Sequence, residues 1–137
     1  PGCRTRVISG TLAGHKGPID DPHTDVTYFD VALEPGAVFT HELRDDMAAF
    51  VYAYEGNGTL ADKELPTHAL ATLSDGGALA VHATDALRFI LVAGRPLREP
   101  VVQYGPFVMN SRAEIEQAFA DYRDGKLVLK RAAWVSD

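Results

Sequence analysis

The chain has 137 residues, which is enough for one domain and too few for two of ordinary size. Hydrophobic residues make up 46% and charged residues 23%, a globular composition that excludes a disordered chain. Thirteen Lys and Arg against 19 Asp and Glu leave a net charge of -6, so a phosphate backbone would be repelled overall and nucleic acid is not expected as a direct partner.

Nothing in the sequence points to an oxidising compartment or a membrane. The single cysteine, Cys3, cannot form an internal disulfide. The apolar run 87–93 is far too short to span a bilayer and contains Arg88, and no leader-like segment opens the chain. We therefore expect a cytoplasmic protein with no membrane partner. The chain starts Pro1-Gly2 without an initiator Met, which leaves open whether it is a natural single-domain protein or a fragment.

Short apolar runs separated by turn residues predict an all-β fold. Turns are indicated at 34–36, 56–58 and 74–77, where Gly, Pro, Asn and Asp gather. Because the runs recur every 8–12 residues, no helical crossover fits between them and the sheets should be antiparallel. The predicted strands are 6–9, 26–33, 37–43, 48–54, 69–73, 78–82 and 87–93, with a further short candidate at 59–61.

The alternation along two of these runs predicts how they pack. In 26–33, Phe29, Val31 and Leu33 share one side of the strand and Asp30 lies opposite. The run 48–54 has apolar or aromatic groups on both sides, as in a strand placed between two layers. Both patterns fit a closed jelly roll with a packed interior.

One helix is predicted near the end of the chain, over 112–124. Ser111 and Glu114 have the spacing of a capping box. One apolar stripe then follows at positions i, i+3, i+4 and i+7, formed by Ile115, Ala118, Phe119 and Tyr122. Gly125 is placed to end the helix in a left-handed conformation. The stripe needs a partner, which we expect to be the outside of the barrel or another subunit.

His41 lies in the segment closest to a metal motif. The run 35–43 is similar to the first metal motif of cupins, in which a glycine and a short strand precede His-any-His. Residues i and i+2 of a strand point the same way, so the second ligand would stand at Leu43, while Glu42 points to the opposite face. The carboxylate of the motif would fall near Met47 or Ala48. One histidine is too few ligands for a catalytic metal.

The remaining sequence carries no other recognisable reaction chemistry. His15 and His23 lie in a loop-like stretch where solvated histidines are commoner than metal ligands, and His68 and His82 stand beside apolar strand residues. The paired carboxylates at 20–21 and 45–46 are consecutive and flanked by turn residues, so they are expected to be solvated loop charges. There is no nucleophile elbow, phosphate-binding loop or Cys-x-x-Cys.

Most of the chain, about residues 4–127, resembles the C-terminal half of pirins. The motifs that carry the resemblance are RFILVAGRPLREP (88–100), VVQYGPFVMN (101–110), RAEIEQA (112–118), TYFDV (27–31) and FVYAYEGNG (50–58). The resemblance implies a single antiparallel cupin, or jelly-roll, barrel with a C-terminal α-helix over 4–127, followed by a tail at 128–137.

Pirins are bicupins whose single iron, held by three histidines and a glutamate, belongs to the N-terminal barrel. The resemblance therefore implies no metal and no cofactor in this chain, and the position of the last cupin histidine corresponds to Leu87. No catalytic residue is predicted. The candidates for positions in the barrel interior or a pocket are His41, Leu43, Tyr52 and Leu87.

Two classes of function follow. In the first, the chain is a metal-free cupin domain that supports an N-terminal iron barrel; intact relatives act as quercetinase-type dioxygenases or transcriptional co-regulators. In the second, it is a stand-alone cupin that binds a small organic ligand or a protein partner as a homodimer. The expected partners are accordingly an N-terminal pirin cupin or a second copy of the chain. A metal site built from His15 and His23 is a third and less favoured alternative.

Overall fold

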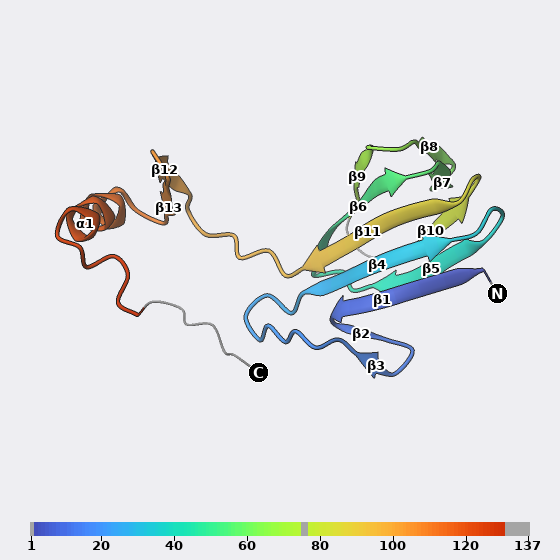
Figure 1. The fold of residues 1–137 in the computed structure, drawn as a ribbon, viewed down its shortest axis with the longest axis horizontal. Helices are drawn as coiled ribbons and strands as arrows, with labels where there is room; N and C mark the ends of the chain where they lie inside the picture. Colours follow the sequence, from blue (N-terminus) through green and yellow to red (C-terminus); the bar gives the residue numbers. More distant parts are fainter. Residues whose placement is uncertain (1, 75–76, 131–137) are drawn as a thin grey trace. The chain divides into compact units, whose positions relative to one another are not determined.

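A computed structural model describes residues 2–74 and 77–130 (Figure 1). It divides into two compact units, residues 1–97 and 98–137, which are described separately. No helix among the described residues is long and apolar enough to cross a membrane. The elements of unit 1 are β1 (Cys3–Ser9), β2 (Thr11–Leu12), β3 (His15–Lys16), β4 (Thr27–Leu33), β5 (Val38–Leu43), β6 (Ala48–Glu55), β7 (Gly58–Leu60), β8 (Lys63–Leu65), β9 (Leu70–Thr72), β10 (Gly77–Ala83) and β11 (Leu87–Gly94); those of unit 2 are β12 (Val102–Tyr104), β13 (Phe107–Met109) and α1 (Arg112–Arg123).

Unit 1 is built from two antiparallel sheets. The first has the strand order β1-β4-β11-β6-β9 and the second has the order β5-β10-β7-β8, and a small β2–β3 hairpin stands beside them (Figure 1). Strands distant in the sequence are neighbours: Phe29 of β4 pairs with Leu91 of β11, and Phe39 of β5 pairs with Val81 of β10. The prediction of an all-β, antiparallel fold with one C-terminal helix is confirmed.

The core fills the space between the two sheets. Alternate residues are buried along β4, β6, β10 and β11, and the inward rows of β4 and β11 include Phe29, Leu87 and Phe89, all with no exposed surface. Phe39 of the second sheet meets Phe89 of the first edge-on, with ring centroids 5.7 Å apart. Each such side chain stabilises the fold by roughly 1.5–3 kcal/mol relative to leaving it in water. The side assignment predicted for 26–33 is thus confirmed.

The strand β6 is buried on one face only. Its Val51 and Ala53 are fully buried, whereas Phe50, Tyr52 and Tyr54 lie half-buried on the other face of the sheet. The expectation of a strand covered on both sides was therefore wrong for the described part of unit 1, because the aromatic side chains instead spread over the outer face. There the Tyr54 hydroxyl donates a hydrogen bond of 2.6 Å to Asp30 on β4.

Several short strands were not predicted from the sequence. The two-residue strands β2 and β3 and the three-residue strands β8, β12 and β13 are too short to show an alternation of apolar and polar residues. The candidate at 59–61 corresponds to β7, which begins one residue earlier, at Gly58. The other strand ends lie within one residue of the predicted ones, except the start of β1, which is at Cys3, three residues earlier than predicted.

Unit 2 contains the predicted helix, which ends at Arg123, one residue before the predicted end. Ser111 caps its N-terminus: its hydroxyl oxygen accepts a hydrogen bond from the Glu114 backbone N–H at 3.3 Å. The Glu114 carboxylate in turn accepts from the backbone N–H of Asn110 at 3.1 Å, one residue earlier than in the usual capping box. Gly125 has a φ of +70°, the left-handed conformation expected just beyond a helix.

The apolar stripe of α1 packs on a partner that we did not predict, the β12–β13 hairpin of its own unit. Phe119 meets Phe107 and Tyr104 edge-on, with centroid separations of 5.0 and 5.6 Å. Ile115 and Ala118 are buried beside it. The last member of the stripe, Tyr122, is 70% exposed, so the hairpin covers only the first two turns of the stripe.

The substitution Phe119→Asp tests this packing. A carboxylate among aromatic rings loses hydration without gaining a partner, so we expect unit 2 to lose on the order of 2–4 kcal/mol of stability. Tyr122→Asp is the matched control, because its side chain is exposed and its substitution should change stability by no more than about 0.5 kcal/mol. Amide hydrogen exchange of the helix measures both; equal protection in the two variants would show that the stripe is not docked.

Candidate functional site

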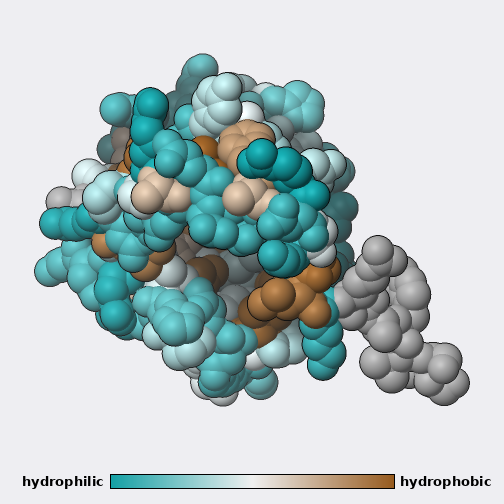
Figure 2. All heavy atoms as spheres, turned by 90° about the vertical axis from the view of Figure 1, so that its left-hand side faces the viewer, coloured by the Kyte–Doolittle hydropathy of each residue, from teal (hydrophilic) through white to brown (hydrophobic). Residues whose placement is uncertain are grey.

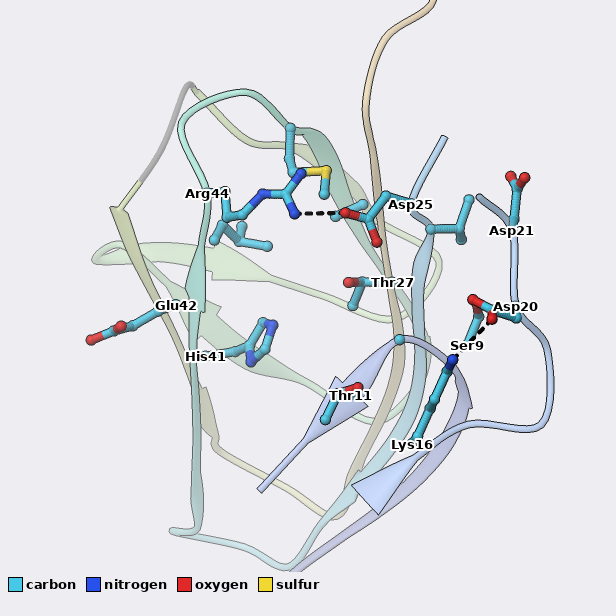
Figure 3. A pocket seen from close by; sticks show the side chains of 15 residues that line it. Ser9, Thr11, Lys16, Asp20, Asp21, Asp25, Thr27, His41, Glu42 and Arg44 are labelled. Carbon is cyan, nitrogen blue, oxygen red and sulfur yellow. Dashed lines mark hydrogen bonds and ion pairs between the residues drawn. The ribbon is translucent and has the colours of Figure 1, made fainter. Parts of the chain in front are cut away.

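A cavity of about 420 Å³ opens at one end of unit 1 (Figure 3). Its lining comes from β5, from the start of β4, from Ala93 near the end of β11, and from the segment 9–25 that carries the β2–β3 hairpin. The residues that meet there are far apart in the sequence, and the sheet topology brings them together. The volume is within the usual range for sites that hold small organic ligands.

The segment 9–25 is held closely against the end of β1. Gly17 donates a backbone hydrogen bond to the Gly10 carbonyl at 2.8 Å, and the Ser9 hydroxyl donates to the Ile19 carbonyl at 2.9 Å. A Cβ at Gly17 would lie 2.6 Å from the carbonyl oxygen of Ile8, so only glycine permits this approach. The cavity wall is therefore a packed part of the fold.

His41 projects into the cavity from β5. It belongs to the inward row of that strand, between the buried Phe39 and the half-buried Leu43, while Glu42 points away on the other side (Figure 3). Its ring meets Phe29 edge-on at a centroid distance of 5.1 Å. Burial lowers the pKa of His41, and the smaller effect of the Glu42 charge opposes that shift. His41 is therefore neutral at neutral pH, with one ring nitrogen as donor and the other as acceptor.

The charged groups at the rim are paired with one another. Arg44 contacts Asp25 with its Nη1 at 2.6 Å and holds Asp46 through Nε and Nη2 at 3.0 and 3.1 Å. These hydrogen bonds raise the pKa of Arg44 and lower that of Asp46. On the other side of the mouth, Lys16 binds Asp20 at 2.9 Å. Both lining cations are thus neutralised by protein carboxylates.

The Asp21 carboxylate forms hydrogen bonds within its own loop. Its carboxylate accepts a hydrogen bond from the Thr24 hydroxyl and another, of 3.0 Å, from the backbone N–H of His23. These two bonds, the hydroxyl first, lower the pKa of Asp21. In Figure 3 the Asp21 side chain points away from His41. This carboxylate therefore stabilises the loop and does not face the interior.

The side chains around His41 do not form the donor set of a cupin iron site. Leu43, at the second position of the motif, lines the same cavity, and Met47 is a buried thioether at its edge. Within residues 2–74 and 77–130 there is no group of three His, Cys, Asp or Glu that could hold a metal ion. A catalytic metal in proteins usually takes three protein ligands, and here a single imidazole is in place.

The structure brings together two of the four predicted interior residues. His41 and Leu43 line one cavity. Tyr52 does not belong to the interior, because it lies on the outer face of β6 with its hydroxyl 3.4 Å from Nδ1 of His68. Leu87 is fully buried in the core at the first residue of β11, six residues before Ala93, which lines the cavity. Leu87 is thus an interior residue as predicted, although it does not line the cavity, because strand alternation gives a residue's face and not its height along the strand.

Six polar lining residues were missed altogether: Ser9, Thr11, Lys16, Asp25, Thr27 and Arg44. Five of them precede or begin β4 and one follows β5, so no spacing along the chain links them to His41. The loop histidines do not take their place, since neither His15 nor His23 lines the cavity. Only knowledge of which residues contact one another in the fold would have identified these polar lining residues.

A comparison with protein families identifies the family of the chain. The profile of the pirin C-terminal cupin domain matches residues 28–128. The chain belongs to the pirin family. The resemblance noted in the sequence is confirmed, and the two-sheet architecture of unit 1 is that of a cupin.

The relatives are about twice as long as this chain. Human pirin is 37% identical over 142 residues, covering 98% of the chain and 49% of that protein. A Pseudomonas aeruginosa protein named provisionally as a quercetin 2,3-dioxygenase is 42% identical over 135 residues, or 93% of the chain and 47% of that protein. The crystal structure of a quercetin 2,3-dioxygenase from Acinetobacter baumannii superposes with a TM-score of 0.85 at 33% identity, covering 92% of the chain and 44% of the enzyme. The chain thus spans about half the length of the proteins it matches.

The environment of His41 predicts a pH dependence. Because its pKa is lowered in the folded state, the unfolded chain takes up a proton at a higher pH than the folded chain. The contribution of neutral His41 to the free energy of unfolding is therefore fully present above the ordinary histidine pKa of about 6.5. It is lost as the pH falls through the lower pKa of the folded state. We expect an NMR titration of the His41 ring with a midpoint below 6.5. In urea unfolding, wild type should lose more stability than His41→Gln between pH 7.5 and pH 5, and a midpoint at or above 6.5 contradicts the prediction.

Proposed function

We propose that this chain acts as a metal-free C-terminal cupin that supports a preceding, iron-binding cupin barrel. The observation that carries the proposal is the lining around His41, where Leu43 and Met47 stand at positions that a cupin metal site fills with ligands. The coverage of about half of each relative supports it, because the other half leaves room for one more barrel. Dioxygenase activity of the quercetinase type, or a role in transcriptional co-regulation, would then belong to the two-barrel protein and not to this chain alone.

Unit 2 carries the surface best suited to that partner barrel. Unit 2 exposes large apolar side chains in addition to the part of the α1 stripe that the hairpin covers. Figure 2 shows hydrophobic patches on an otherwise mostly hydrophilic face. Contiguous apolar patches of this kind mark interaction sites on soluble proteins. The exposed members in unit 2 are Val101, Tyr104, Val108, Tyr122, Leu127, Val128 and Leu129.

A second candidate function is favoured by the same surface. Two copies of the chain could cover it about a twofold axis, the commonest arrangement of homo-oligomers, and work as a stand-alone cupin dimer. The net charge of -6 per chain opposes such pairing only weakly, since surface charges are screened over roughly 8 Å at physiological salt. In either arrangement a specific interface needs to bury about 1,200 Å² or more.

Metal content tests the first half of the proposal. Protein expressed in medium supplemented with iron, zinc and manganese should contain no stoichiometric ion, because one imidazole does not hold such an ion tightly. Elemental analysis after gel filtration gives the count. One tightly bound ion per chain that disappears in His41→Ala would refute the proposal; substoichiometric metal unaffected by His41→Ala would be surface binding and would leave it standing.

Association tests the second half. The chain should form a 1:1 complex with the separately expressed N-terminal half of the Pseudomonas relative, measured by light scattering over a dilution series. Tyr122→Asp should weaken the complex at least about tenfold, since it puts a charge into an apolar contact. Glu116→Gln, at an exposed polar position on the same helix, should leave it unchanged. A dimer of the chain alone would favour the second function, and a monomer at tens of micromolar that binds no N-terminal half would contradict both.

A further inference from the structure

The cavity at His41 has hydrogen-bonding groups that the protein itself leaves unused. In the part of the chain that the structure describes, neither the His41 ring nor the hydroxyls of Thr11 and Thr27 have a hydrogen-bond partner among the protein groups. Figure 3 places these three side chains around the same space. Gly10 keeps that space open beside β4, because a Cβ there would lie 3.1 Å from Oγ1 of Thr27. Three neutral polar groups thus converge on one volume.

The cations at the mouth of the cavity are already paired with carboxylates of the protein. Arg44 is held by Asp25 and Asp46, and Lys16 is held by Asp20. An anionic ligand would have to displace one of these carboxylates, and a cationic one would have to displace a lysine or arginine. Burial lowers the pKa of His41 and so favours its neutral form, and the two further carboxylates of the lining, Asp21 and Glu42, point away from His41 (Figure 3). The electrostatics of the cavity therefore favour an uncharged guest.

One part of the wall is apolar. Val26, Leu43 and Ala93 contribute aliphatic surface, and Met47 adds a thioether that adapts to irregular shapes. The lining thus combines this apolar patch with polar side chains, and sites for small ligands likewise contain both kinds of surface. A guest that fits both parts combines a compact apolar body with hydroxyl groups.

We propose that this cavity is a binding site for an uncharged, hydroxyl-bearing small organic molecule, with His41, Thr11 and Thr27 as its hydrogen-bonding groups. Hydroxyls match this set because each can donate to the acceptor nitrogen of a neutral imidazole and accept from a threonine O–H. The site lies wholly within unit 1. It does not depend on the partner barrel proposed above, and it requires no metal.

Three ligands that share one ring test the charge preference: benzyl alcohol, benzoate and benzylammonium. Each is titrated at pH 7.5 into the intact, isotope-labelled chain while the NMR signals of His41, Thr27 and the Met47 methyl group are followed. Benzyl alcohol should give saturable shifts at all three residues, in the millimolar range usual for so small a ligand. The two charged analogues should bind at least about tenfold more weakly, which corresponds to about 1.4 kcal/mol.

Variants then assign the hydrogen bonds. His41→Phe and Thr27→Val each remove one polar group while keeping its approximate shape, and each should weaken benzyl alcohol binding about three- to tenfold. Glu64→Gln is the control, because Glu64 is exposed on β8 and does not line this cavity, so binding should not change. Dispersed amide spectra verify that each variant folds, and the two substitutions serve as independent tests. Absence of saturation up to tens of millimolar, equal affinity for benzoate, or unchanged affinity in both variants would overturn the proposal.

Discussion

The inward row of β5 links the core of unit 1 to its cavity, and most of what the domain can do depends on it. Phe39 lies against Phe89 of the opposite sheet, His41 lies one step further along the same row against Phe29, and Leu43 reaches the cavity wall. Because side chains alternate with a period of two, the position of Phe39 in the core determines that His41 faces inward and Glu42 outward. His41 is thereby held between aromatic rings and an open, polar volume, which is why burial lowers its pKa.

The same constraint explains how a cupin barrel can stay folded with an incomplete donor set. The row of β11 consists of Leu87, Phe89 and Leu91, all fully buried, so apolar packing occupies the interior of the sheet pair. Buried ionisable groups destabilise a core unless they are paired or hold a metal, whereas leucine and phenylalanine at those positions stabilise it directly. Apolar packing between the two sheets therefore stabilises the fold of unit 1.

The features that could be predicted well from the sequence are those determined by interactions between residues close together in the chain. The six longer strands follow from alternation and turn residues, and the helix follows from Ser111, Glu114 and its apolar stripe. The failures involve contacts between distant segments. The β12–β13 hairpin that receives Phe119 is too short to show a pattern, and the cavity joins Thr27 of β4 to His41 of β5 through topology alone. Tyr52 was misplaced for a related reason: a strand with apolar groups on both faces does not reveal which face meets the core.

The two units differ in the surfaces that they leave free, and this difference separates two kinds of recognition. Unit 2 exposes apolar groups such as Tyr122 and Leu129, whose removal from water requires an extended partner surface. Unit 1 instead pairs its rim charges internally and encloses neutral polar groups within a volume of about 420 Å³, which a macromolecular surface would not enter. Because the residues of the two surfaces do not overlap, we expect a substitution such as Tyr122→Asp to weaken the proposed association without affecting the cavity. His41→Phe perturbs the cavity without touching the exposed apolar set. The partner barrel and the small molecule that we propose would therefore be recognised through different residues and different physical interactions.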